Sequence, residues 1–308
     1  MTTLAERALR YDREHARSLR ALSYRMLGSR AEAEDIVQEA WMRWAEVDES
    51  TVQHAGAFLS RLVTNLCLDK LGSAAARREQ YVGVWLPEPL LDEAGWSPGP
   101  EVQAEFAEDV SVAFMLALER LSPLERAAFL LHDVFDLDFD EVGRRLERDA
   151  AACRKLASRA RNHVKTDYAR HEVDAEERDR LFNAFSEALG SLDVDALARV
   201  LADDCVMLAD GGGKVSAVAR PLHGGALIAQ TFIGFARLPT SQGWRLQAMR
   251  INGLPGCLVF DAAGTLVQTI ALAPSATESG RIGALYVQRN PDKLAGVLAA
   301  LERSAGVV

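Results

Sequence analysis

Apolar residues recur at intervals of three or four along residues 1–76, the spacing of α-helices that bury one face. Ser29 followed by Glu32 is a capping-box pattern, and it predicts a helix over residues 31–47. The apolar positions that this helix would bury are Ile36, Val37, Ala40, Trp41 and Trp44. After a polar loop at 47–56, a second helix is predicted over 57–76. Its inward positions are Phe58, Leu59, Leu62, Val63, Leu66 and Cys67.

Each predicted helix also carries an outward stripe. Residues at positions i, i+3, i+4 and i+7 share one helix face. The stripe of the first helix consists of Asp35, Gln38, Glu39 and Met42. The stripe of the second consists of Arg61, Asn65 and Asp69, and Arg77 and Arg78 follow near its end. Spacing alone indicates ordinary solvated faces.

Three helix starts follow one another in residues 122–164. Ser122 and Glu125 form a capping box around Pro123, and Asp138 and Asp149 are further N-caps. The last helix would expose Arg154, Lys155, Ser158, Arg159 and Arg161 opposite its apolar face. Residues 140–165 hold eight Lys/Arg against four Asp/Glu. A short helix, a tight turn and a basic helix are typical of a helix-turn-helix, although a small bundle with a solvated basic face fits the same pattern.

Residues 79–109 interrupt the helical pattern with four prolines and an excess of acids, which predicts a linker. Two tryptophans in it indicate that part of this linker packs somewhere. A second, charged boundary follows residue 165. Beyond it the pattern predicts helices at 181–189 and 194–201, then strands at 205–209, 215–219, 244–251, 256–260, 266–272 and 284–288, then a helix from Asn290. This order predicts an α+β domain with a curved antiparallel sheet.

Composition narrows the class of protein. A chain of 308 residues with 49% hydrophobic residues is long enough for about two domains. The net charge of −9 argues against non-specific coating of nucleic acid, so DNA binding would need a local basic face. No apolar run is long enough for a membrane span, and the charged start does not resemble a signal peptide, so we expect a cytoplasmic protein. The four scattered cysteines predict reduced core thiols, and no cluster indicates a metal or a cofactor.

These motifs, in this order, resemble a bacterial extracytoplasmic-function (ECF) sigma factor. AEDIVQEAWMRW is similar to the core of sigma region 2, and FLSRLVTNLCLDKL to the helix after it. LERLSPLERAAFLLHDVFDLDFDEVGRRLERDAAACRKLASRARNHV resembles region 4. The last part resembles SnoaL-like domains of the ketosteroid-isomerase-type cone fold. The resemblance thus implies all-α region 2 (1–78), an acidic linker (79–109), an all-α region 4 (110–165) and an α+β cone (178–308).

The resemblance also implies partners and roles. Core RNA polymerase would be bound through Asp35, Gln38 and Glu39. The promoter −10 element would be bound through Arg61, Asn65, Asp69, Arg77 and Arg78, and the −35 element through Arg154, Lys155, Ser158 and Arg159. The fused arrangement is similar to one subgroup of these sigma factors. The marks of that subgroup are Trp85, Pro87 and Pro89, then Asp210, Gly211, Gly212, Gly213 and Lys214, then Asn290, Pro291, Asp292 and Lys293.

The role of the cone is open between two hypotheses. As an enzyme, it would use Asp210 as a general base, with His223 as the nearby partner. Against this, Asp210 runs into three glycines, and the late strands offer no second acid or base, so we predict no catalytic residues. As a regulator in cis, its 210–214 loop would dock near the Trp85–Pro89 linker, with Lys214 paired to a linker acid. The cone's apolar interior either is filled by side chains, the commoner outcome, or holds a small-molecule ligand.

A third hypothesis is a one-component regulator that binds operator DNA without polymerase. It predicts tight binding to duplex DNA by the free protein, and usually a dimer. A sigma factor instead binds free DNA weakly and co-purifies with core polymerase.

Overall fold

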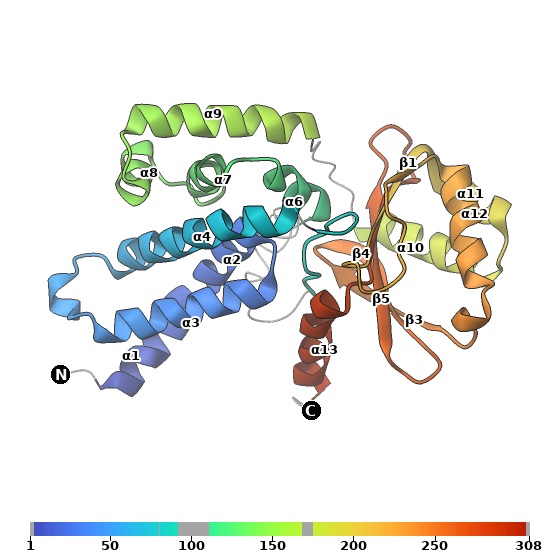
Figure 1. The fold of residues 1–308 in the computed structure, drawn as a ribbon, viewed down its shortest axis with the longest axis horizontal. Helices are drawn as coiled ribbons and strands as arrows, with labels where there is room; N and C mark the ends of the chain where they lie inside the picture. The colour runs from blue at the N-terminus through green and yellow to red at the C-terminus, as the bar shows by residue number, and fades with distance from the viewer. Residues whose placement is uncertain (1–2, 80, 92–110, 168–174, 306–308) are drawn as a thin grey trace. The chain divides into compact units, whose positions relative to one another are not determined.

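The computed structural model of the chain describes residues 3–79, 81–91, 111–167 and 175–305. It divides into two compact units (Figure 1). The first unit comprises Met1–Gln80 and Ala94–Tyr168, and the second comprises Tyr81–Glu93 and Ala169–Val308. Part of the predicted linker, residues 81–91, therefore belongs to the second unit, and residues 92–109 lie outside the described residues.

The first unit begins with four helices. They are α1 (Leu4–Tyr11), α2 (Arg17–Leu27), α3 (Arg30–Glu46) and α4 (Ala55–Glu79). The two predicted helices are confirmed as α3 and α4. The Ser29 side chain accepts a hydrogen bond from Glu32 N and so starts α3, as predicted. The expected inward residues of α3 are buried, except that Trp41 is half-buried.

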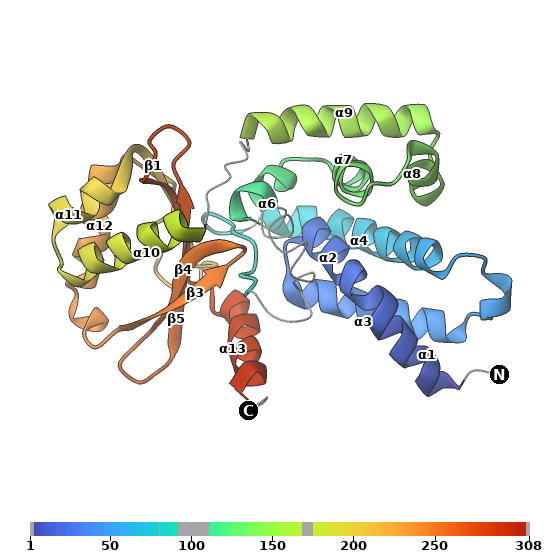
Figure 2. The ribbon, with the colours of Figure 1, turned by 180° about the vertical axis from the view of Figure 1, so that it is seen from behind.

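Four further helices follow in the first unit. They are α6 (Val112–Glu119), α7 (Pro123–Phe129), α8 (Phe139–Leu146) and α9 (Ala150–Asp167). All three predicted caps are confirmed, because Ser122, Asp138 and Asp149 each accept a hydrogen bond from the main-chain N–H of the third residue of the following helix. Helix α4 packs between α2 and α3 on one side and α7 and α8 on the other (Figures 1 and 2).

The second unit is built on a six-stranded sheet of order β2-β1-β6-β5-β4-β3. The strands are β1 (Leu201–Asp210), β2 (Leu222–His223), β3 (Arg245–Ile251), β4 (Leu254–Phe260), β5 (Leu266–Pro274) and β6 (Ile282–Gln288). The expected antiparallel sheet is confirmed for every strand pair except one, because β1 pairs with β6 in parallel. The first and last long strands of the domain are therefore neighbours in the sheet, next to the short edge strand β2.

The predicted strand at 215–219 is also wrong. Gly211 O accepts hydrogen bonds from both Lys214 N and Val215 N, so the chain folds back on itself after β1. A Cβ on Gly211 would lie 2.4 Å from Val215 O, which shows how closely the two segments approach. Helix α12 (Gly225–Ala236), which the pattern did not predict, follows this turn.

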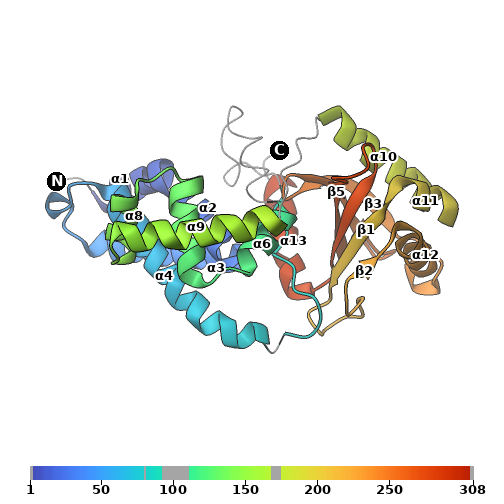
Figure 3. The same cartoon turned by 90° about the horizontal axis from the view of Figure 1, so that it is seen from above.

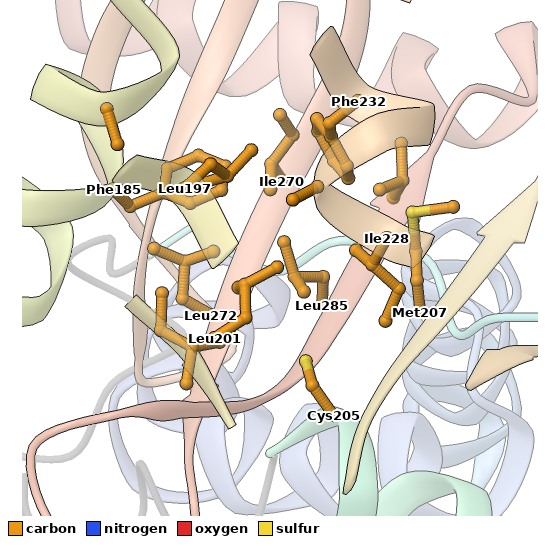
Figure 4. Close-up of a cluster of buried hydrophobic side chains, with 14 of the residues drawn as sticks. Phe185, Leu197, Leu201, Cys205, Met207, Ile228, Phe232, Ile270, Leu272 and Leu285 are labelled. Atoms are coloured by element: carbon orange, nitrogen blue, oxygen red, sulfur yellow. The ribbon is translucent and has the colours of Figure 1, made fainter. Parts of the chain in front are cut away.

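The two faces of the sheet are covered by different segments. Helices α10 (Ala175–Gly190), α11 (Val194–Val200) and α12 cover one face, and α13 (Pro291–Ala305) lies on the other (Figure 3). The face under α10, α11 and α12 holds the main hydrophobic core, whose side chains pack against one another in Figure 4. Residues 81–91 join the sheet edge of this unit through a bridge between Leu91 and Ile251. The fold thus brings residues 81–91, β1, β6 and α13 into one unit.

The four cysteines are free and buried, as expected. Burial raises the pKa of Cys67, Cys205 and Cys257 to about 12, which keeps these thiols protonated and unreactive. Among the described residues, no helix is long and apolar enough to cross a membrane, and no group of three or more His, Cys, Asp or Glu side chains could hold a metal ion.

Candidate functional sites

The outward face of α9 carries the four residues predicted to meet the −35 element. Arg154, Lys155, Ser158 and Arg159 are all exposed, whereas Cys153, Ala157 and Ala160 on the opposite face are buried against the rest of the unit. This division follows from the 3.6-residue period of the helix. The structure therefore places all four predicted residues on one accessible face of the second helix of a helix-turn-helix.

The charges on this face are not equally available. Arg159 Nε lies 2.7 Å from Glu125 Oε1, the carboxylate that also closes the capping box at the start of α7. The hydrogen bond from Arg159 is the largest of several contacts that hold the pKa of Glu125 below its ordinary value. Arg154 lies over the ring of Phe139, 5.6 Å from its centre, and pairs with no described acid. Arg154 and Lys155 are thus the charges most available to phosphate or to a base edge.

The outward stripe of α3 is accessible along its length. Asp35 and Gln38 are exposed, and the half-buried Glu39 pairs with Arg43 on the next turn at 2.5 Å. Met42, which continues the stripe, is exposed as well. An acidic stripe that ends in an exposed methionine is a surface suited to a basic protein partner.

One residue of the outward stripe of α4 contacts the helix-turn-helix. Arg61 Nη2 lies 2.5 Å from Glu147 Oε1, the residue that ends α8 in a left-handed conformation. Asn65 is half-buried and Asp69 is exposed. Arg77 and Arg78 lie within α4, but their side chains are outside the described residues. The structure does bring Arg61, Asn65 and Asp69 onto one face of α4, as predicted.

A buried carboxylate marks a different kind of site in the second unit. Asp210, at the end of β1, has no exposed surface, and its two oxygens accept five hydrogen bonds. Oδ1 accepts from Tyr81 Oη at 2.6 Å and Gly212 N at 2.9 Å. Oδ2 accepts from Leu86 N at 3.0 Å, Gln288 Nε2 at 3.3 Å and Lys293 Nζ at 2.7 Å. Two of the five donors belong to residues 81–91, which we call the docking segment.

Lys293 closes this site from α13. Besides Asp210, its ammonium donates to Leu86 O at 2.5 Å and lies over the rings of Trp85 and Tyr81, 4.4 and 4.9 Å from their centres. A cation held by a carboxylate, a carbonyl and two aromatic faces is well compensated for its loss of water. Lys293 therefore ties the docking segment to both β1 and α13.

Amide side chains complete the contact. Gln288 Nε2 donates to Pro87 O at 3.4 Å, and Asn290 Nδ2 donates to Tyr81 Oη at 2.9 Å. Asn252 forms two hydrogen bonds with Leu90: its Oδ1 accepts from Leu90 N, and its main-chain N–H donates to Leu90 O. Burial, followed by the contact with Asp210, raises the pKa of Tyr81, so its hydroxyl stays a donor.

Glycine is required where the turn after β1 meets α13. A Cβ on Gly212, whose φ is +63°, would lie 2.4 Å from Asn290 Nδ2, and a Cβ on Gly213 would lie 3.0 Å from the Val82 side chain. Only residues without side chains allow this approach. The structure thus brings together Trp85, Pro87, Asp210, Gly212, Gly213, Asn290 and Lys293, and Pro89 is buried in the same segment.

One expected contact is wrong. We expected Lys214 to pair with an acid of the linker, but its Nζ lies 2.6 Å from Asp292 in the first turn of α13, and both side chains are largely exposed. Glu88, the one linker acid in the docking segment, is buried instead. Pro291 starts α13 beside this pair.

Sequence reasoning missed Tyr81, Gln288 and Asn252. Gln288 and Asn252 gave a weak signal, since Gln288 is a polar residue at the end of an apolar strand and Asn252 directly follows a strand. Nothing in the pattern marked Tyr81, whose partners Asp210 and Asn290 lie 129 and 209 positions away along the chain.

These two units define a helix-turn-helix DNA-binding protein fused to an α+β cone domain. Residues 12–77 match the family model for Sigma-70 region 2, and residues 111–164 match that for Sigma-70, region 4. The chain is 36% identical over 285 residues to the ECF RNA polymerase sigma factor SigJ of Mycobacterium tuberculosis, across 90% of each chain. It is 29% identical to the probable ECF RNA polymerase sigma factor SigI of the same species, across 92% of this chain and 93% of that one.

A solved structure agrees with these relatives. The crystal structure of M. tuberculosis SigJ superposes with a TM-score of 0.72 at 30% sequence identity, covering 94% of this chain and 98% of that chain. The protein belongs to the ECF family of sigma-70 RNA polymerase sigma factors, and its second unit is a SnoaL-like C-terminal extension. The alternative of a one-component regulator is not favoured.

Proposed function

We propose that this sigma factor directs promoter-specific initiation under the control of its own SnoaL-like unit, which acts by holding the docking segment. The observation that supports this control is the buried Asp210, which accepts five hydrogen bonds, two of them from the docking segment. Because that segment directly follows α4, a clamp on it constrains the chain that connects region 2 to region 4. A change in the docked population would then alter how the two regions engage a promoter together.

The surfaces of the first unit supply the contacts for initiation. In this proposal core RNA polymerase meets the α3 stripe of Asp35, Gln38 and Glu39. The −10 element is bound through Arg61, Asn65, Asp69, Arg77 and Arg78. The −35 element is bound through Arg154, Lys155, Ser158 and Arg159. The exposure of the α9 face supports the last assignment, because a recognition helix must reach base edges and phosphates without obstruction.

The SnoaL-like unit has no catalytic role in this proposal. An ionised carboxylate has about four lone-pair sites, and the five donors around Asp210 leave none for a substrate proton. None of these contacts involves His223, which is exposed on β2. The Asp210 side chain therefore serves as an acceptor that organises the docking segment.

Transcription by reconstituted holoenzyme tests the proposal. Lys293→Met removes the cation that joins Asp210, Leu86 and the two aromatic rings, and Lys214→Met is the matched control at the exposed pair with Asp292. We expect Lys293→Met to change the yield of promoter transcripts by about fivefold or more, the lower range of coupling between sites, without changing association with core polymerase. Lys214→Met should match the parent chain.

If Lys293→Met folds normally and transcribes like the parent, control through the docking segment is refuted. If neither protein binds core enzyme or initiates at any promoter, the proposed initiation function itself fails.

A further inference from the structure

An apolar cavity of about 640 Å³ opens in the SnoaL-like unit, on the face of the sheet that α10 and α12 cover. Met207, Phe232 and Ile270, which are labelled in Figure 4, are among the residues that line it. Side chains therefore do not fill this part of the domain. The volume lies in the range of small-molecule sites, which are concave and mostly apolar with a few polar groups.

Large apolar side chains surround the cavity and reach solvent. Leu192, Phe235, Leu238 and Leu246 line the cavity and are each between 38% and 45% exposed. Single exposed apolar side chains are ordinary, but four that share one cavity form a patch of the kind that marks a binding site.

Several polar side chains line the same cavity, and two of them have buried atoms that form no hydrogen bond. Arg289 Nε and Ser186 Oγ are buried without a hydrogen-bond partner among the described residues. Gln268 also lines the cavity, and its side chain bonds to no described residue. Buried polar atoms without partners are uncommon in folded proteins, and a group bound in the cavity would account for both of these.

Arg289 sets the charge of the ligand. A guanidinium donor of Arg289 bonds to the carbonyl oxygen of Ser216, but Arg289 forms no ion pair with an acid in the described parts of the chain. Burial alone lowers its pKa, and a guanidinium stays protonated even so. A positive charge without a counter-ion beside an apolar cavity is complementary to an anion with an apolar body. The planar fork of arginine can bind both oxygens of a carboxylate at once, and a carboxylate carries the single negative charge that one guanidinium balances.

We propose that this cavity binds a small amphipathic monocarboxylate, with its carboxylate on Arg289 and its apolar body along α12 and the sheet. The site takes one negative charge, because Arg289 is the only Lys or Arg among the described residues that line the cavity. It is separate from the Asp210 site, whose carboxylate bonds to the docking segment. The inference concerns binding alone and does not depend on the proposed control of transcription.

Calorimetric titration of the full chain with decanoate tests the site, with decanol as the uncharged probe of the same length. We expect saturable binding of one decanoate per chain, at least tenfold tighter than that of decanol. Arg289→Met should weaken decanoate binding about tenfold or more and leave decanol unchanged. Arg281→Met, at a partly exposed arginine paired with Glu278 outside the cavity, should bind both probes like the parent chain.

Ser186→Leu gives a second test that does not depend on Arg289. Leucine favours the helical conformation of α10, removes the buried hydroxyl and fills part of the cavity, so both probes should bind more weakly. The proposal is overturned if decanoate shows no saturable binding, or if decanoate and decanol bind the parent chain equally. It is also overturned if a folded Arg289→Met or Ser186→Leu chain binds decanoate as tightly as the parent. Circular dichroism and thermal unfolding establish that each variant is folded.

Discussion

Lys293→Met is the most direct probe of how strongly the docking segment is held. The substitution keeps a long apolar stem but removes the ammonium that lies 2.7 Å from Asp210 Oδ2. Removing one partner of a buried ion pair costs about 3–5 kcal/mol, because the other charge stays buried without compensation. Four donors to Asp210 remain, and the Lys293 side chain is 14% exposed, so we expect the lower end, about 3 kcal/mol.

Hydrogen exchange of the docking segment measures this loss. The amide of Leu86 donates to Asp210 Oδ2 and exchanges only when the segment opens. A loss of about 3 kcal/mol in the free energy of opening corresponds to roughly 100-fold faster exchange of a peptide that contains Leu86. Lys214→Met is the control, because an exposed pair such as Lys214–Asp292 contributes only about 0–1 kcal/mol. Equal exchange rates in the Lys293→Met and Lys214→Met chains would refute the reasoning that the buried pair holds the segment.

Three further predictions concern the first unit. Arg126, only 2% exposed, donates to Met26 O at 2.6 Å and to Glu119, so Arg126→Met should destabilise this unit by about 3 kcal/mol, seen as a lower melting temperature of its calorimetric transition. Arg159→Gln should raise the pKa of Glu125 towards its ordinary value of 4.5, measured by NMR titration. Because the folded pKa is depressed, this carboxylate stabilises the unit above pH 4.5, and the contribution falls as the pH drops below it. Arg154→Ala should weaken holoenzyme binding to a promoter by about 1–3 kcal/mol and leave core association intact, which a promoter-binding titration would show.

The helices of the first unit were predictable because their signals are local. A cap at Ser122 or Asp138 forms within one turn, and the apolar period of α3 or α4 spans only a few residues. The residues that form such features are neighbours in the sequence, so the sequence alone shows them. The predicted roles of the exposed residues on these helices came from family resemblance, since exposure and spacing alone do not distinguish a binding face from a solvated one.

The second unit was harder to predict because its decisive contacts are distant in sequence. Helix α12 has apolar residues on most of its surface and starts at Gly224 without a side-chain cap, so neither period nor cap marked it. The parallel pairing of β1 with β6 joins strands that more than 70 residues separate, for example Asp210 and Gln288. Lys214 was assigned to the wrong acid because its partner, Asp292, is distant in the sequence. Nothing near Lys214 in the sequence indicates that the first turn of α13 lies beside it.

The pairing of β1 with β6 also relates the two sites of the SnoaL-like unit to each other. Asp210 pairs with Gln288 and Ala209 with Val287, and successive residues of a strand point to opposite faces. Asp210 and Gln288 therefore hold the docking segment, whereas Ala209 and Val287 line the cavity. A ligand that repacks the cavity acts on the same two strands that position the docking carboxylate. Such a ligand can change the docked population only if it binds the docked and undocked forms with different affinity, since equal affinity would leave the equilibrium unchanged.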